Sequence, residues 1–150
     1  MSRDFKKGTA LKTNILAKIL HEGQTYGDQP YLYHLRAVVS RVHELYSKTS
    51  CLADLETIAW LHDSVEDNPR LTLDDLRLLG YTTQVIDAID AMTKRDNETR
   101  AEYLQRVTLN QLATKVKIAD ARCNYEESLK TNDFYRIKRY EKTLTALGDA

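Results

Sequence analysis

The chain has 150 residues, the usual size of one domain and enough to bury a core without cross-links. Hydrophobic residues make up 42% and charged residues 29%, with only five glycines and two prolines, a composition typical of a helical globular protein and not of a disordered one. Lys plus Arg equals Asp plus Glu at 22 each, so net charge gives no general attraction to nucleic acid or to an anionic membrane; only a local basic groove would.

Cysteine usage and the N-terminal residues favour the cytoplasm. Cys51 and Cys123 are far apart and form neither a metal-ligand pair nor a disulfide framework. The segment from Met1 to Lys7 lacks the apolar run of a signal peptide, and no stretch of about 18 apolar residues occurs. We therefore expect one domain over residues 1–150, with neither a membrane nor a nucleic acid polymer as partner. The sequence leaves a homo-oligomer open.

Apolar residues recur at spacings of three and four along the chain, which predicts an all-α bundle of about eight helices and no strand. The first helix is expected from Thr9 to His21, and the segment Gly23–Pro30 that follows it is expected to be a loop. The other helices are expected over residues 32–46, 54–67, 73–79, 85–92, 98–109, 112–129 and 133–147.

The helix expected over residues 54–67 carries an unusual group of polar side chains. On a helical wheel His62 lies within the apolar stripe, and Glu66 lies one turn beyond it. Asp63 and Asp67 form a parallel row. Crowded carboxylates at the C-terminal end of a helix oppose one another and the helix dipole, which points to a compensating cation such as a metal ion. The alternative is a solvated acidic face beside a packed histidine.

Two further polar residues lie on apolar helix faces. Asp120 falls inside the inward stripe of residues 112–129, and because an unpaired buried carboxylate is costly, it needs a base or a metal. A salt bridge to an arginine is the plainer alternative. His34 lies at the edge of the stripe of residues 32–46, where it is either a ligand or a packed side chain. Together with His62 and Asp63, these residues form a mixed nitrogen and oxygen set suited to Mn²⁺, Fe²⁺ or Zn²⁺.

A distant His, an adjacent His-Asp pair and a later Asp are the fingerprint of the HD superfamily, which this chain resembles through His34, His62-Asp63 and Asp120. It is similar in particular to the hydrolase domain of Rel/Spo-type guanosine tetraphosphate enzymes. The matching segments, in family order, are Tyr31–His34, Ala59–Asp67, Thr93–Lys94 and Lys117–Asn124. The His-Asp-x-x-Glu-Asp form of residues 62–67 is typical of that branch. A synthetase domain does not fit in this length, so the resemblance is to the small stand-alone hydrolases.

The resemblance implies an HD-domain helical bundle that removes the 3′-pyrophosphate from (p)ppGpp. It implies one divalent ion, with Mn²⁺ as the first expectation, bound by the four fingerprint residues. Glu66 and Asp67 are implied to position or deprotonate the attacking water, whose pKa the metal lowers. The implied substrate contacts are Lys94, Asn124, Arg136 and Tyr140. Lys94, Arg136 or Arg139 would stabilise the leaving pyrophosphate, although such a residue is more often a plain surface charge.

The loop before His34 departs from the family. The family has Gly-Gln-x-Arg-Lys there, whereas this chain has Gly23-Gln24-Thr25-Tyr26-Gly27 and lacks both basic residues. The missing arginine normally packs against guanine, so Tyr26 becomes the candidate for stacking on a purine, with simple packing as the alternative. The alternatives to a (p)ppGpp hydrolase are an HD phosphatase or phosphodiesterase for another nucleotide and a nucleotide-sensing or protein-interaction module with weak chemistry.

Overall fold

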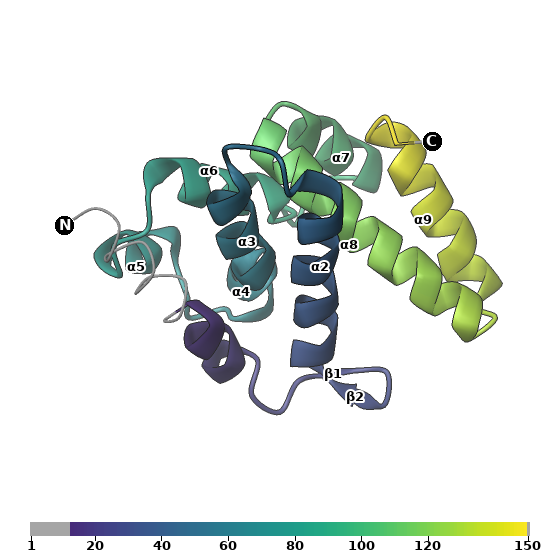
Figure 1. Ribbon diagram of the computed structural model, residues 1–150, viewed down its shortest axis with the longest axis horizontal. Helices are drawn as coiled ribbons and strands as arrows, with labels where there is room; N and C mark the ends of the chain where they lie inside the picture. The colour runs from purple at the N-terminus through teal and green to yellow at the C-terminus, as the bar shows by residue number, and fades with distance from the viewer. Residues whose placement is uncertain (1–12, 150) are drawn as a thin grey trace.

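The computed structural model describes residues 13–149 and confirms the all-α prediction (Figure 1). Residues 13–20 are helical, whereas residues 9–12 of the first expected helix lie outside the described residues. The other helices are α2 (Tyr31–Tyr46), α3 (Leu52–Leu61), α4 (Ser64–Asp67), α5 (Leu73–Leu78), α6 (Thr83–Met92), α7 (Arg100–Thr108), α8 (Gln111–Lys130) and α9 (Phe134–Ala146). Within residues 13–149, no helix combines the length and the apolar character that crossing a bilayer requires.

Helix α8 organises the bundle, because α2, α3, α6, α7 and α9 all pack against it. Figure 1 shows α8 passing behind α2 and ending beside the start of α9, which runs back antiparallel to it towards the C-terminus. The core between α3, α6 and α8 is made of aliphatic side chains, and Ile58, Ile89 and Val116 are fully buried there. Burying each such side chain stabilises the fold by roughly 1.5–3 kcal/mol. The same packing brings the polar faces of α2, α3 and α8 together.

Short polar side chains set where several helices begin. Thr72 and Thr99 each form a capping box, in which the threonine hydroxyl accepts from the third residue of the helix and the side chain of that residue accepts from the threonine N–H. Asn110 and Asp133 accept from backbone N–H groups at the starts of α8 and α9. Each cap contributes about 1 kcal/mol. These caps explain why the predicted helices after residue 72 agree with the structure to within two residues.

The prediction of one continuous helix from Asp54 to residue 67 was wrong. Helix α3 ends at Leu61, residues 62 and 63 form a turn, and α4 starts at Ser64. The His62 Nδ1 lies 2.8 Å from the carbonyl oxygen of Ala59, which is the group that an uninterrupted helix would offer to the N–H of Asp63. The side chain thus competes with the backbone for one acceptor, and a wheel drawn for a regular helix does not include that competition.

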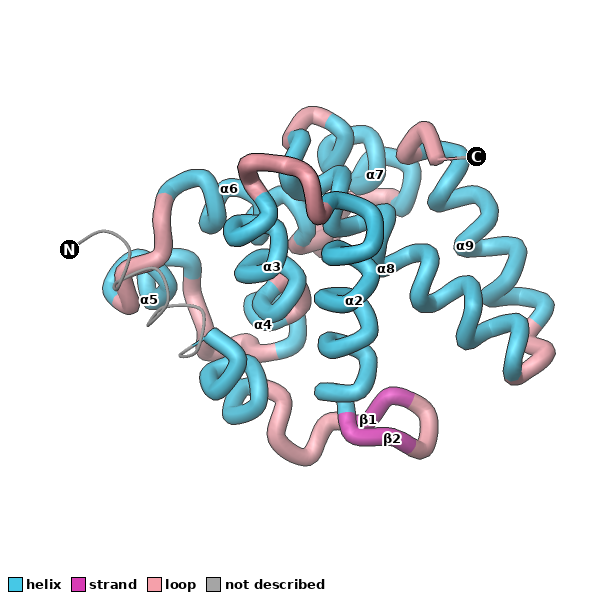
Figure 2. Tube along the Cα trace, in the orientation of Figure 1, coloured by secondary structure: helices cyan, strands magenta, loops and turns pink. Residues whose placement is uncertain are grey.

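The expected loop over Gly23–Pro30 contains a small hairpin, which the prediction of no strand missed. Strands β1 (Thr25–Tyr26) and β2 (Gln29–Pro30) pair antiparallel, with Thr25 opposite Pro30. Gly27 adopts φ 61° at the tip, a conformation that tight hairpin turns require. Figure 2 shows these strands just before the start of α2. Strands of two residues are too short to produce a period-two pattern, so they could not be predicted from the sequence.

Candidate metal centre

Three of the predicted metal ligands lie in one cluster. His34 comes from the first turn of α2, and His62 and Asp63 come from the turn between α3 and α4. One ligand atom from each of these residues lies within 4.8 Å of the other two, so the group could hold a metal ion. His34 is 3% exposed and His62 is 1% exposed. Both imidazoles are therefore removed from bulk water, and the break after α3 is what presents two consecutive side chains to the same point.

The imidazole of His62 is held with one nitrogen facing the acids. Its Nδ1 must carry a proton, because the partner at 2.8 Å is the Ala59 carbonyl, which can only accept. Its Nε2 lies 3.0 Å from Asp63 Oδ2 and 3.5 Å from Asp120 Oδ1. Among the described residues this buried nitrogen has no hydrogen-bond partner of good geometry. A neutral imidazole would direct a lone pair at two carboxylates, so this position needs positive charge, supplied by a proton on Nε2 or by a bound cation.

Burial and the neighbouring charges shift the pKa values of this cluster in opposite directions. Burial by itself lowers the pKa of His62, but the charges of Asp63 and Asp120 outweigh it and hold the pKa well above the usual value. Burial would raise the pKa of Asp63, and the neighbouring His62 outweighs that effect, so the pKa of this carboxyl lies below its ordinary value. The cluster therefore stabilises positive charge between its carboxylates.

Asp120 lies beside the three clustered ligands, as predicted, but its partners differ from the arginine that was the plainer alternative. Its Oδ1 is 2.8 Å from His34 Nε2 and accepts from Asn124 Nδ2 at 3.0 Å. Its Oδ2 accepts from Lys117 Nζ at 2.8 Å. Burial alone would raise the pKa of Asp120, but Lys117 and the histidines hold it well below the ordinary value. Asp120 is thus an ionised, buried carboxylate next to both imidazoles.

The two predicted catalytic carboxylates lie at the edge of the cluster and face different neighbours. Asp67 Oδ2 accepts from Gln24 Nε2 at 2.9 Å. Glu66 lines a groove of about 380 Å³ together with Thr93 and Lys94. Burial, followed by the charge of Asp63, raises the pKa of Glu66, and burial also raises the pKa of Asp67. A carboxylate whose pKa is raised toward neutrality is better suited to take a proton from water.

Four of the five predicted substrate residues meet on the other side of His34. The hydroxyl of Tyr26 donates to Asn124 Oδ1 at 2.7 Å, and its ring stacks on His34 with centroids 4.6 Å apart and 14° between the planes. The guanidinium of Arg136 lies 5.8 Å from the centre of the Tyr26 ring and 5.6 Å from that of Tyr140. One face of Tyr26 is therefore covered by a predicted metal ligand. A purine would have to stack on the opposite face.

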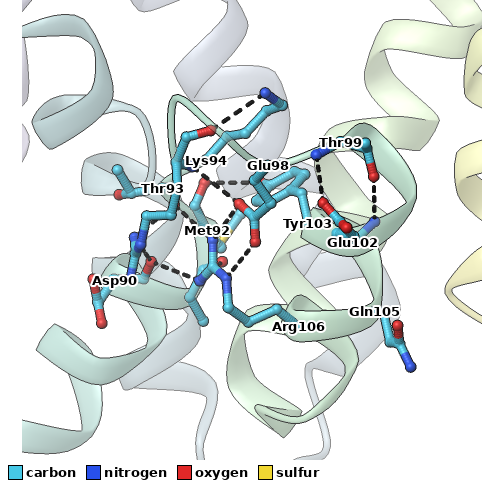
Figure 3. Close-up of polar contacts among 12 residues, drawn as sticks. Asp90, Met92, Thr93, Lys94, Glu98, Thr99, Glu102, Tyr103, Gln105 and Arg106 are labelled. Carbon is cyan, nitrogen blue, oxygen red and sulfur yellow. Dashed lines mark hydrogen bonds and ion pairs between the residues drawn. The ribbon is translucent and has the colours of Figure 1, made fainter.

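Lys94, the fifth predicted substrate residue, lies apart from these four, next to Glu66. Figure 3 shows its side chain turned away from the Glu98 and Arg106 pair. Arg106 fixes the backbone around it: the guanidinium pairs with Glu98 through Nε at 2.7 Å and donates from Nη2 to the Thr93 carbonyl at 2.8 Å. Nη1 donates to the carbonyl of Ala91 at 3.1 Å. Lys94 is thus carried on a firmly held segment that lines the Glu66 groove.

Sequence reasoning missed several polar residues around the cluster. The Tyr31 hydroxyl donates to Asp63 Oδ2, and the Lys117 ammonium pairs with Asp120. His21 is buried, stacks on Tyr31 with centroids 4.8 Å apart, and contacts Gln24 through Nδ1 at 2.7 Å. Tyr31 and Lys117 belong to the segments that carry the family resemblance, so their position in those segments was an available sign. Helix periodicity alone gives none for His21, because a buried His on an apolar face is most often a packed residue.

Comparison with known proteins assigns neither a family nor a function to the chain. No protein-family model matches the chain, and no curated protein matches it. What can be argued about function therefore rests on the residues and contacts of the candidate metal centre.

Proposed function

We propose that the chain is a metal-dependent phosphohydrolase that acts on a nucleotide. The observation that carries this proposal is the buried His62 Nε2, which has no hydrogen-bond partner among the described residues and faces the carboxylates of Asp63 and Asp120. Two imidazoles and two carboxylates are ligands that Mn²⁺, Fe²⁺ and Zn²⁺ accept. The donor set therefore fits one divalent ion, and we propose Mn²⁺, held by His34, His62, Asp63 and Asp120.

When bound, a divalent cation supplies positive charge that polarises a phosphate oxygen and lowers the pKa of water beside it. Glu66 or Asp67 takes the proton of the water that attacks phosphorus, since both lie within one turn of the ligands and have a raised pKa. Gln24 holds Asp67 through the hydrogen bond to Oδ2. Lys94 and Arg136 supply charge for the phosphate groups as the bond from phosphorus to the leaving oxygen breaks.

The substrate that we propose first is (p)ppGpp, with cleavage at its 3′-pyrophosphate. This rests on the resemblance of the segment His62–Asp67 and on the meeting of Tyr26, Asn124, Arg136 and Tyr140 beside His34. We also propose the cytoplasm as its compartment, in line with the free thiols of Cys51 and Cys123. A second candidate is a phosphatase or phosphodiesterase for another nucleotide. It is favoured by the hairpin, which carries Tyr26 where the family has basic residues.

The test is turnover of a nucleotide panel with Mn²⁺, containing ppGpp, pppGpp, GTP, ATP and cyclic nucleotides. We expect release of pyrophosphate from ppGpp and pppGpp, loss of turnover with a chelator, and recovery on adding Mn²⁺. Faster release of phosphate from a different nucleotide would replace the first substrate by the second candidate. Protein that binds Mn²⁺ but turns over nothing on the panel would contradict the enzyme proposal and favour a sensing module.

A further inference from the structure

A groove between α7 and α9 gathers basic side chains away from the metal centre. It has a volume of about 500 Å³, and its charged lining consists of Arg100 from α7 and Lys138, Arg139 and Lys142 from α9. Among residues 13–149, no acidic side chain lines it. The chain as a whole has equal numbers of acids and bases, so this is a local separation of charge. A groove of this sign attracts anions.

The two arginines of the groove, Arg100 and Arg139, lack the acidic partners that five of the eight other arginines in residues 13–149 have. Within residues 13–149, none of the four basic side chains forms an ion pair, whereas the arginines that do so are Arg41, Arg77, Arg95, Arg106 and Arg122. Arg100 Nη2 donates at 2.7 Å to the hydroxyl of Thr143, which is fully buried, so its guanidinium is fixed at the groove wall. Burial and the nearby Arg139 lower the pKa of Arg100. An anion in the groove would relieve this repulsion.

The rest of the lining is apolar and includes one aromatic ring. Leu104 lies at the base of the groove and is 5% exposed, while Ala101 and Ala146 leave room because of their small side chains. Tyr135 is 75% exposed and has no ring partner among the described residues. A ligand that fills the groove therefore needs an anionic part and a flat apolar part. The volume is within the range typical of sites for small molecules.

The groove and the metal centre use different residues. Arg136 of α9 lies over the rings of Tyr26 and Tyr140, whereas Arg139 and Lys142 line the groove with residues of α7. No residue that lines the groove belongs to the cluster of ligands and substrate residues around His34. Arg139, which the sequence offered as a partner for the leaving pyrophosphate, is thus placed in the groove.

We propose that the groove between α7 and α9 is a second binding site, which takes a nucleoside polyphosphate. Its basic side chains hold the phosphates, and Tyr135 and Leu104 contact the base. The proposal does not rest on the proposed hydrolase activity, because binding here uses no metal ligand and requires no turnover.

The first experiment is calorimetric titration of the full chain with ATP, adenosine and tripolyphosphate, each with a chelator present. ATP has both the anionic and the flat part, whereas each of the other two probes has one. We expect ATP to bind at least about tenfold more tightly than either of them. Tripolyphosphate binding as tightly as ATP would overturn the proposal, since attraction by charge alone would then explain it. Failure of ATP to bind would overturn it as well.

Two variants locate the binding. Arg139→Ala with Lys142→Ala removes two exposed charges and should weaken ATP binding by about tenfold or more. The matched control removes two exposed charges elsewhere, Arg36→Ala with Lys48→Ala, and should leave binding unchanged. Ala101→Trp keeps every charge but fills the groove, and it should weaken binding as much as the first variant. Normal binding by Ala101→Trp that retains a cooperative unfolding transition would overturn the proposal.

Methyl NMR spectra decide between this groove and the metal centre. Addition of ATP should shift the methyl signals of Ala101, Leu104 and Ala146, and it should do so equally in the Tyr26→Ala variant. Shifts confined to methyl groups near His34, or binding lost only in Tyr26→Ala, would assign the nucleotide to the metal centre and overturn the proposal.

Discussion

Two charged networks in this molecule, one around Arg106 and one around His62, differ in whether their buried polar groups all have hydrogen-bond partners. Around Arg106, the guanidinium donates to Glu98 and to several backbone carbonyls, and the Glu98 carboxylate accepts from Arg106 and from the backbone N–H of Arg95 (Figure 3). Around His62, a buried nitrogen faces two carboxylates without a hydrogen bond. A network in which every buried polar group has a hydrogen-bond partner stabilises the fold. A buried polar group without such a partner calls for a ligand from outside the chain.

The largest expected effect is on Mn²⁺ binding, and it distinguishes the network around His62 from the one around Arg106. His62→Ala should abolish Mn²⁺ binding and lower turnover by at least about a thousandfold, because it removes a ligand from the centre. Metal analysis and a thermal unfolding assay with and without Mn²⁺ measure this: the ion should raise the Tm of the wild type but not that of the variant. Arg106→Ala is the control and should keep the Mn²⁺ effect. Retained metal in His62→Ala would mean that His62 is a packed side chain.

Glu66→Gln should separate metal binding from chemistry. The variant keeps all four ligands and should bind Mn²⁺ normally, but it loses the carboxylate that accepts the proton, so kcat should fall roughly 10²- to 10⁴-fold. Metal analysis and steady-state kinetics on the same preparation test this. An unchanged kcat would leave Asp67 as the proton acceptor, and a loss of metal would place Glu66 among the ligands.

Arg106→Ala should show what the network around Arg106 contributes. Its loss leaves Glu98 and three backbone carbonyls without their donor, so we expect the free energy of unfolding to fall by about 1–2 kcal/mol, mainly through the lost hydrogen bonds to the carbonyls. Urea unfolding measures the change. Arg77→Ala is the matched control: its ion pair with Asp74 is exposed and should contribute less than about 1 kcal/mol. Equal effects of the two substitutions would contradict a structural role for the Arg106 network.

The smallest expected effect is the pH dependence of that network. The hydrogen bond from Arg106, followed by the one from the Arg95 backbone, lowers the pKa of Glu98 from 4.5 to about 2. A carboxyl whose pKa is lower in the folded state stabilises the fold above its unfolded pKa and loses this contribution as the pH falls through the folded pKa. The difference in unfolding free energy between the wild type and Arg106→Ala should therefore shrink between pH 4.5 and pH 2. Urea titrations across this range would show a constant difference if Glu98 did not titrate with Arg106.

The amphipathic pattern was sufficient for most of the helices and for the candidate ligands that lie on their apolar faces. His34 and Asp120 were predicted because polar residues on such faces need a partner, and the structure places them 2.8 Å apart. The turn at His62 and Asp63 was not predictable, because it depends on a side chain that competes for the Ala59 carbonyl. A wheel drawn for a regular helix contains no term for that competition.

The contacts around the cluster differ in whether the sequence could predict them. Lys117 is three residues from Asp120, and a helical wheel places such pairs side by side, so this contact could have been predicted. The Gln24 contact with Asp67 spans 43 residues and joins a turn to the end of α4, so no local pattern encodes it. The basic groove between α7 and α9 likewise exists only because two separate helices pack together.

The hairpin before α2 gives the molecule room for evolutionary change. Tyr26 reaches Asn124 and His34 from a strand of two residues, and Gly27 and Asp28 form an exposed tip. His34, His62, Asp63 and Asp120 lie on the helices or on the turn between α3 and α4, outside this tip. If the proposed activity holds, mutations that lengthen or replace the tip would alter which base is accepted and leave the proposed metal centre intact. Selection could then act on recognition and on catalysis separately.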